Sequence, residues 1–317
     1  MSAQTIPLTV RPRPVRVWRT MLRLQRGPLV LWAVVVTGVS GILLWAYGPG
    51  ASAARAALQN TCTATGCDWS AAVSLYELAY TAAEIAIGVL PYLAAAWAGA
   101  VVGRELESGT AHLAWTQSIP PARWLAGTLA VPGALLTAGT TVLVLLHRLL
   151  FDANKVPVAW NWWNDATYNA DGPVAVAHVL LGLAVGALAA LLLRRALPAL
   201  GAGIVVTAAL VAGLFAARPH LWAQSTSLGT LANGPRAPSN VLLGDEGAVT
   251  STGAHIADPG CGNSTRCLKE HDITGYFSHY HPAAHFWPLQ LVETGILLAA
   301  TALLLAAAFT VLRRRTA

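Results

Sequence analysis

The sequence has little charge for its length. Of its 317 residues, 11% are charged and 55% are hydrophobic, whereas soluble globular domains carry about 25% charged residues. This composition places the chain among membrane proteins, so spans of roughly 20 residues are the natural units for dividing it. The net charge of +6 arises from basic residues beside apolar runs, which is typical of membrane orientation and predicts no nucleic-acid partner.

Lysine and the common catalytic motifs are also scarce. The only lysines are Lys155 and Lys269, and the sequence has no G-x-x-x-x-G-K-[ST] phosphate loop with which to hydrolyse ATP. The H-E-x-x-H and G-x-S-x-G signatures of metalloproteases and serine hydrolases are absent as well. We therefore expect a non-enzymatic membrane protein with no cofactor of its own.

Six apolar runs are long enough to cross a bilayer as helices. The predicted spans are 28–47, 76–102, 125–147, 173–193, 196–217 and 285–312. With the N-terminus inside, 13 of the 20 basic residues lie on the cytoplasmic side, and most of the others fall in long outer loops. The predicted fold is an all-α membrane protein of the plasma membrane, multi-pass, with both termini cytoplasmic.

The start of the chain has two further features. A basic segment at 17–26 places apolar residues on one helical face and arginines on the other, which predicts an amphipathic interfacial helix rather than a simple positive flank. The Ala-Ser-Ala at 51–53 could end a secretory signal. The apolar run from Leu29 to Tyr47, however, exceeds the usual signal core of about 7–15 residues.

All four cysteines fall in the predicted outer loops. Their spacing favours two local disulfides, Cys62–Cys67 and Cys261–Cys267, over a zinc site, because neither pair has the spacing of a zinc knuckle. The segment 218–284 is predicted to be an ordered but irregular extracellular cap held by the second disulfide. The outer histidines 271, 279, 281 and 285 are interpreted as surface residues rather than a zinc or copper site.

Polar residues occur within or beside the apolar runs. Glu84 and Glu293 fall deep within predicted spans, and Gln290 lies near the start of the last one. Such carboxylates suit structural contacts between helices, a substrate cavity or a proton relay, and all three alternatives remain open. The aromatic cluster at 160–168 is interpreted as an interfacial belt, with a ligand platform as the alternative.

A polar segment, 103–124, separates the second and third spans at the predicted cytoplasmic surface. Ser108-Gly109-Thr110 is suited to a helix break, and Pro120-Pro121 to a return into the membrane.

The residues of this segment carry a family resemblance. Gly103-Arg104-Glu105, Glu107, Gly109-Thr110, Leu113, Thr116-Gln117-Ser118 and Arg123-Trp124-Leu125 resemble the cytoplasmic coupling loop of type-2 permeases of ATP-binding-cassette (ABC) exporters. The run 281–290, which leads into the last span, is similar to actinobacterial members of that group.

The resemblance implies a membrane dimer, either a homodimer or a pair with a related permease, above separate ATPase subunits that hold ATP and magnesium. It implies that Arg104, Glu105 and Glu107 form salt bridges to the ATPase. It also implies that Gly109, Thr110, Thr116, Gln117 and Ser118 shape the coupling element. A solvated charged loop would explain the charges but not the helix-breaking residues.

The expected function is therefore the permease subunit of an ABC exporter of a hydrophobic or amphiphilic compound, such as a drug, an antibiotic or a lipid-like molecule. The alternative is a polytopic sensor or immunity protein that binds a peptide or cell-wall precursor without transport. A membrane-embedded enzyme that uses the outer histidines and Glu293 is a third, weaker interpretation, because the sequence lacks a catalytic motif for it.

Overall fold

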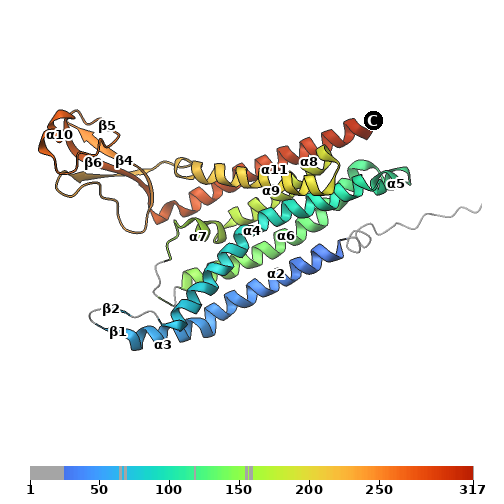
Figure 1. The fold of residues 1–317 in the computed structure, drawn as a ribbon, viewed down its shortest axis with the longest axis horizontal. Coiled ribbons are helices and arrows are strands. Elements are labelled where there is room, and N and C mark those ends of the chain that lie inside the picture. Colours follow the sequence, from blue (N-terminus) through green and yellow to red (C-terminus); the bar gives the residue numbers. More distant parts are fainter. Residues whose placement is uncertain are drawn as a thin grey trace, which may run out of the picture.

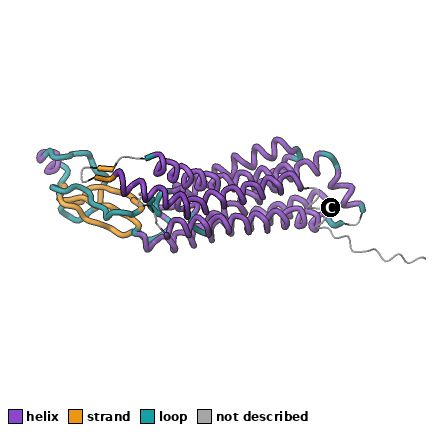
Figure 2. Tube along the Cα trace, turned by 90° about the horizontal axis from the view of Figure 1, so that it is seen from below, coloured by secondary structure: helices purple, strands orange, loops and turns teal. Residues whose placement is uncertain are grey.

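The computed structural model describes residues 25–63, 66–67, 70–117, 119–153, 156 and 160–316. Within these residues six helices are long and apolar enough to cross a membrane, so the predicted all-α six-span fold is confirmed. Four of them, α4, α6, α9 and α11, pack against α8, while α2 packs on α6 and α4, and a small sheet lies beyond one end (Figures 1 and 2). The six are α2 (Arg26–Trp45), α4 (Ala71–Glu107), α6 (Pro121–Ala153), α8 (Pro173–Leu193), α9 (Ala196–Ala217) and α11 (Phe286–Thr316).

Short elements lie at the two ends of this bundle. The sheet end carries a π-helical turn η1 (Ala46–Gly50), α3 (Ala51–Thr61), β1 (Cys62–Thr63), β2 (Gly66–Cys67), α7 (Asp165–Ala170), η2 (Arg218–His220) and η3 (Ala283–His285). The opposite end, called the α5 end below, carries α5 (Thr110–Thr116) and the end of α11 (Figure 1).

The helices extend further than the apolar runs predicted. The second span was expected over 76–102, but α4 has 37 residues and continues through Glu107. The expected loop 103–124 is therefore shorter, because its first five residues belong to α4 and its last four to α6. Polar helix ends lack the hydropathy that marks a span, so composition alone underestimates their length.

Helix α8 forms the centre of the bundle, and its glycines explain how closely α4 approaches it. A Cβ at Gly182 would lie 2.1 Å from the carbonyl oxygen of Pro91, and one at Gly186 would lie 2.1 Å from that of Ala95. Gly99 of α4 likewise faces the backbone of Ala199 in α9. These small residues permit backbone contact between helices, as such residues do in membrane interfaces.

The segment 218–284 is more regular than expected. Four strands form an antiparallel sheet in the order β3-β6-β4-β5, which corrects the prediction of an irregular cap. The strands are β3 (Ser225–Thr230), β4 (Leu242–Thr250), β5 (His255–Ile256) and β6 (Ile273–His281), with α10 (Thr265–Glu270) beside them. The strands are rich in Gly, Ser and Thr, so their sequence pattern is weak.

The second predicted disulfide, Cys261–Cys267, is present next to this sheet. The backbone of Cys62 pairs with that of Cys67 between β1 and β2. The side chains of this first pair lie outside the described part of the structure, so their disulfide stays a prediction.

The N-terminal amphipathic helix predicted at 17–26 lies almost wholly outside the described residues. The description begins at Gln25, which is buried although it is polar. Its side-chain amide donates to the carbonyl of Thr128 at 3.3 Å and accepts from the Trp97 indole at 3.0 Å. These bonds fix the start of α2 against α4 and α6.

The close approach of α4 and α8 generates the first prediction. Gly186→Val should destabilise the bundle by about 1–3 kcal/mol, because the added methyl groups overlap the α4 backbone. Gly88→Val is the matched control, since nothing lies within 4 Å of a Cβ there. Unfolding of the detergent-solubilised protein, followed by tryptophan fluorescence, measures both. Equal stability of the two variants would contradict the packing described.

Candidate functional site

The α5 end is built around a sharp turn between two helices. Helix α4 ends at Glu107, Ser108 caps it, and Gly109 adopts a φ of 75° before α5 begins. Because only glycine adopts this left-handed conformation without strain, Gly109 allows α5 to start directly at a new angle. The break expected at Ser108-Gly109-Thr110 is therefore observed.

Hydrogen bonds and aromatic contacts stiffen the turn. The Thr110 hydroxyl donates to the Glu105 carbonyl at 3.2 Å and lies 3.0 Å from the Ser108 hydroxyl. In addition, the Trp115 ring meets the Trp124 ring edge-on at 5.5 Å, which joins α5 to the first turn of α6. Helix α5 is thus attached to both neighbouring helices.

The two glutamates predicted to bind an ATPase contact their own chain. Glu105 accepts a hydrogen bond from the Trp124 indole at 2.6 Å. Glu107 accepts from the backbone N–H of Ala196 at 2.9 Å, at the N-terminus of α9, where a negative charge is favourable. The carboxylates therefore hold α4 to α6 and α9, and their contact with an ATPase stays a prediction.

The surface that α5 presents to solvent is partly apolar. The Leu113 side chain is 61% exposed, and Arg104, His112, Thr116 and Gln117 are exposed around it. The Thr116 hydroxyl donates to the carbonyl of Leu113 and so closes the helix locally. Ser118, the last residue predicted in this site, lies outside the described residues.

At the sheet end, a buried ion-pair network contains one of the predicted carboxylates. Glu293 is fully buried, and both its oxygens accept from the Arg218 guanidinium, at 3.0 Å and 3.1 Å. The same guanidinium donates to Asp165 at 2.9 Å and Asn169 at 2.7 Å, and lies 3.9 Å from the Tyr168 ring centre. A bidentate pair with further donors and acceptors is the arrangement that a buried charge requires.

A second buried network contains Glu84. Thr167 donates to Glu84 at 2.6 Å, and the Nε2 atom of His147 lies 3.6 Å from the same carboxylate oxygen. The other nitrogen of His147 lies 2.5 Å from Asp171, whose second oxygen lies 3.7 Å from Arg148. Two acidic and two basic groups therefore meet here, which compensates charge inside the bundle.

Gln290, the third predicted polar residue, binds backbone rather than charge. Its side-chain amide donates to the Tyr168 carbonyl at 2.7 Å and accepts from the N–H of Val174 at 3.3 Å. All three predicted intramembrane residues therefore converge on α7 and the residues that follow it.

Sequence reasoning missed the partners in these networks. His147 and Arg218 were assigned to a span end and an outer loop, and the carboxylates had no basic neighbour in sequence. His147 and Arg218 lie at the same end of the helix bundle as Glu84 and Glu293. This shared position is the signal that could have paired them. In the cluster predicted to form an aromatic belt, Trp160 stacks on Tyr80 with ring centres 3.6 Å apart and Trp162 is buried, so these two rings face the protein interior, and the belt itself stays a prediction.

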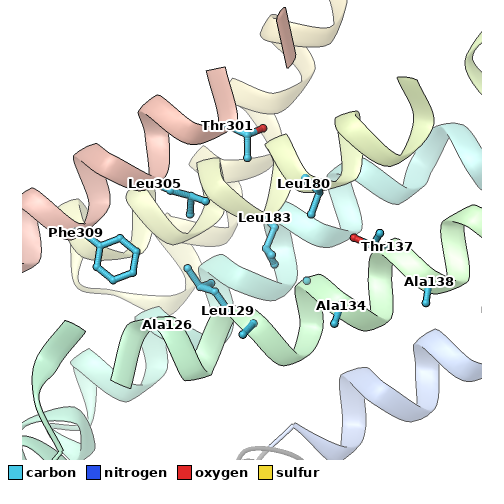
Figure 3. Close-up of a pocket in the computed structure, with 12 residues that line it drawn as sticks. Ala126, Leu129, Ala134, Thr137, Ala138, Leu180, Leu183, Thr301, Leu305 and Phe309 are labelled. Carbon is cyan, nitrogen blue, oxygen red and sulfur yellow. The ribbon is translucent and has the colours of Figure 1, made fainter. Parts of the chain in front are cut away.

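An apolar groove lies between α6, α8 and α11. Its volume is about 660 Å³, and its walls include Leu129, Leu183, Leu305 and Phe309, with the Thr301 hydroxyl at one side. The close-up in Figure 3 shows these side chains facing one another across the three helices. The groove can receive a hydrocarbon group, but it offers few polar groups to orient one.

Metal-competent side chains meet once as a trio within the described ranges, at Cys261, Cys267 and His271. The two sulfur atoms are joined in a disulfide and are therefore unable to act as thiolate ligands. This trio carries no metal site in the oxidised protein.

The comparisons with known proteins agree with this architecture. The family model described as "ABC-2 membrane transporter related" matches residues 30–218. The chain belongs to this family. The resemblance to ABC type-2 permeases is therefore confirmed, and the chain is a multi-pass membrane component of an ABC-2 transporter. No curated protein and no solved structure shows significant similarity to it.

The match covers the α5 turn and ends at Arg218, before the sheet and α11. The family relationship therefore accounts for the first five spans of the transporter. The sheet and Glu293 lie beyond the matched region. Glu293 nevertheless forms an ion pair with Arg218, the last residue of that region.

The Arg218–Glu293 pair generates the second prediction. Glu293→Ala should destabilise the transporter by about 3–5 kcal/mol, because it leaves the buried guanidinium without its main partner. Asp152→Ala is the control, since it removes only the exposed pair with Arg148, worth about 0.3–0.5 kcal/mol. Unfolding in mixed micelles measures the free energy of unfolding of each variant. Equal losses in the two variants would show that the buried pair stabilises the protein no more than the exposed one.

Proposed function

We propose that this chain is the permease subunit of an ATP-driven exporter, with a separate ATPase subunit that docks on α5. The observation that carries the proposal is the α5 turn itself, which lies within the region matched by the ABC-2 family. Its hydrogen bonds make it stiff, and the exposed Leu113 gives it an apolar contact point.

The mechanism follows from the connections of this turn. A partner that pushes α5 also moves α4 and α6, because Thr110 and Trp115 hold it to both. Glu107 passes the displacement to the start of α9 through its bond to Ala196. Helix α4 contacts α8 closely along its length, so movement at the α5 end reaches the networks at the sheet end.

The proposed cargo is a hydrophobic or amphiphilic compound, such as a drug, an antibiotic or a lipid-like molecule. The groove between α6, α8 and α11 supports this class, because its walls are apolar and its volume of about 660 Å³ lies in the range of small-molecule sites. Export, cytoplasmic termini and assembly as a homodimer or with a related permease are parts of the same proposal, supported by the arginine distribution and the family.

The ATPase partner is tested by co-purification from native membranes. The tagged chain should retain an ATPase in a fixed ratio, and Leu113→Asp should reduce that ratio at least tenfold, because a charge disrupts the apolar contact. Leu228→Asp is the matched control, since the Leu228 side chain is also well exposed but lies in β3 at the opposite end. An unchanged ratio for Leu113→Asp would contradict docking on α5.

Glu105 and Glu107 need a gentler test than charge reversal, because both stabilise the chain itself. Glu107→Gln keeps an oxygen that can accept from Ala196 but removes the charge. If Glu107 also pairs with the ATPase, this variant should lower co-purification several-fold, while the loss of charge at the N-terminus of α9 lowers the unfolding temperature only slightly. Loss of both together would assign Glu107 to the stability of the chain alone.

The groove is tested by filling it. Ala134→Phe should reduce the stimulation of ATP hydrolysis by a panel of amphiphilic fluorescent dyes several-fold, because the ring occupies space that lines the groove. Leu145→Phe is the control, as Leu145 is an exposed α6 residue outside the groove. Unaltered stimulation in Ala134→Phe would place the cargo path elsewhere.

The alternative, a sensor or immunity protein without transport, draws on the sheet that follows the family match. It predicts that the chain purifies without an ATPase and that a peptide or cell-wall precursor binds to the sheet. The co-purification experiment therefore separates the two functions.

A further inference from the structure

Two histidines face each other where the sheet joins the last helix. His281 is the final residue of β6, and His285 is the final residue of η3, directly before α11. Their Nδ1 atoms lie 3.1 Å apart, and their rings are inclined by 62°. His281 is fully buried and His285 is half-buried, so the pair lies at the edge of the protein interior.

The surroundings of His281 fix the position of its proton. Its Nε2 atom lies 2.8 Å from the carbonyl oxygen of Pro219 in η2. A carbonyl oxygen only accepts, so Nε2 carries the hydrogen, and in the neutral ring the Nδ1 lone pair is left directed at His285.

This arrangement matches that of a metal ligand. A histidine that binds a metal through one nitrogen usually donates its other N–H to a carbonyl or carboxylate, which fixes the tautomer and the ring orientation. Two nitrogens that each lie about 2.0–2.1 Å from a tetrahedral zinc are about 3.3 Å apart. The observed separation of 3.1 Å is close to this value.

We infer that His281 and His285 bind a divalent transition-metal ion through their Nδ1 atoms. Imidazole nitrogens suit Zn²⁺, Cu²⁺ and Ni²⁺, whereas Mg²⁺ and Ca²⁺ prefer oxygen ligands. Because His285 is only half-buried, water would complete the coordination of the ion, and His220 follows Pro219 directly in the chain.

The position of the ion gives it a structural effect. His281 ends the sheet and His285 precedes α11, while Pro219 follows α9. A bound ion would therefore hold the sheet to the ends of two spanning helices at one point. Occupancy of the site would stiffen the connection between the sheet and the bundle.

The test uses the full-length chain, purified in detergent with a tag that contains no histidine and treated with a chelator. Calorimetric titration with Zn²⁺ should show one site per chain, and Cu²⁺ bound there should show nitrogen hyperfine coupling by electron paramagnetic resonance. His285→Ala should weaken the binding of Zn²⁺ at least tenfold and remove part of the nitrogen coupling. The unfolding temperature without metal should stay unchanged, because His285 is only half-buried.

His271→Ala is the matched control, since His271 is an exposed histidine of the same segment and should leave the affinity unchanged. A His281→Ala variant tests the second ligand, and its unfolding temperature shows whether the chain is still folded. The inference is overturned if the unmutated, chelator-treated chain binds no Zn²⁺, or if His285→Ala binds Zn²⁺ as tightly as the unmutated chain.

Discussion

The ion pair between Arg218 and Glu293 is the interaction on which the sheet end of the bundle depends. A guanidinium and a carboxylate that are both removed from water require partners for almost all their donors and acceptors. Helix α7 supplies those partners, because Asp165, Asn169 and the Tyr168 ring all contact Arg218. Polar contacts thus join the short helix to Arg218 at the end of α9 and, through Arg218, to Glu293 of α11, while Tyr168 adds apolar packing against Phe286.

The same short segment also serves the second network. Thr167 binds Glu84 of α4, and Asp171, which follows α7, binds His147 of α6. Helix α7 and Asp171 therefore link four spanning helices through polar contacts. Helix α4 continues from Glu84 in this region to its end at Glu107 before the α5 turn, a length of about 35 Å at a rise of 1.5 Å per residue. One helix thus connects the buried polar networks at the sheet end with the α5 turn at the opposite end.

The parts of the fold that were predictable from the sequence are those encoded locally. Apolar runs revealed the six spans, Ser108-Gly109-Thr110 revealed the break before α5, and close spacing revealed the Cys261–Cys267 disulfide. The sheet was missed because β6 pairs with β3 and β4 through long connections, and the strands lack a clear alternation of apolar and polar residues.

The partners of buried charges escaped prediction for a related reason. Arg218 and Glu293 are 75 residues apart, and Glu105 meets Trp124 only because three helices converge at the α5 end. A single sequence shows that a carboxylate in a span needs a partner. It does not show which helix brings that partner, because the choice is made by tertiary packing.

The separation of Arg218 and Glu293 along the chain also bears on how the protein is made. Helices enter the membrane in the order of synthesis, and α9 with Arg218 leaves the ribosome before the sheet and α11 exist. Until Glu293 is synthesised, the guanidinium lacks its bidentate partner, so Arg218 is better accommodated among lipid headgroups than in the interior. Burial of this arginine is therefore a late step of biogenesis, completed when the final helix inserts.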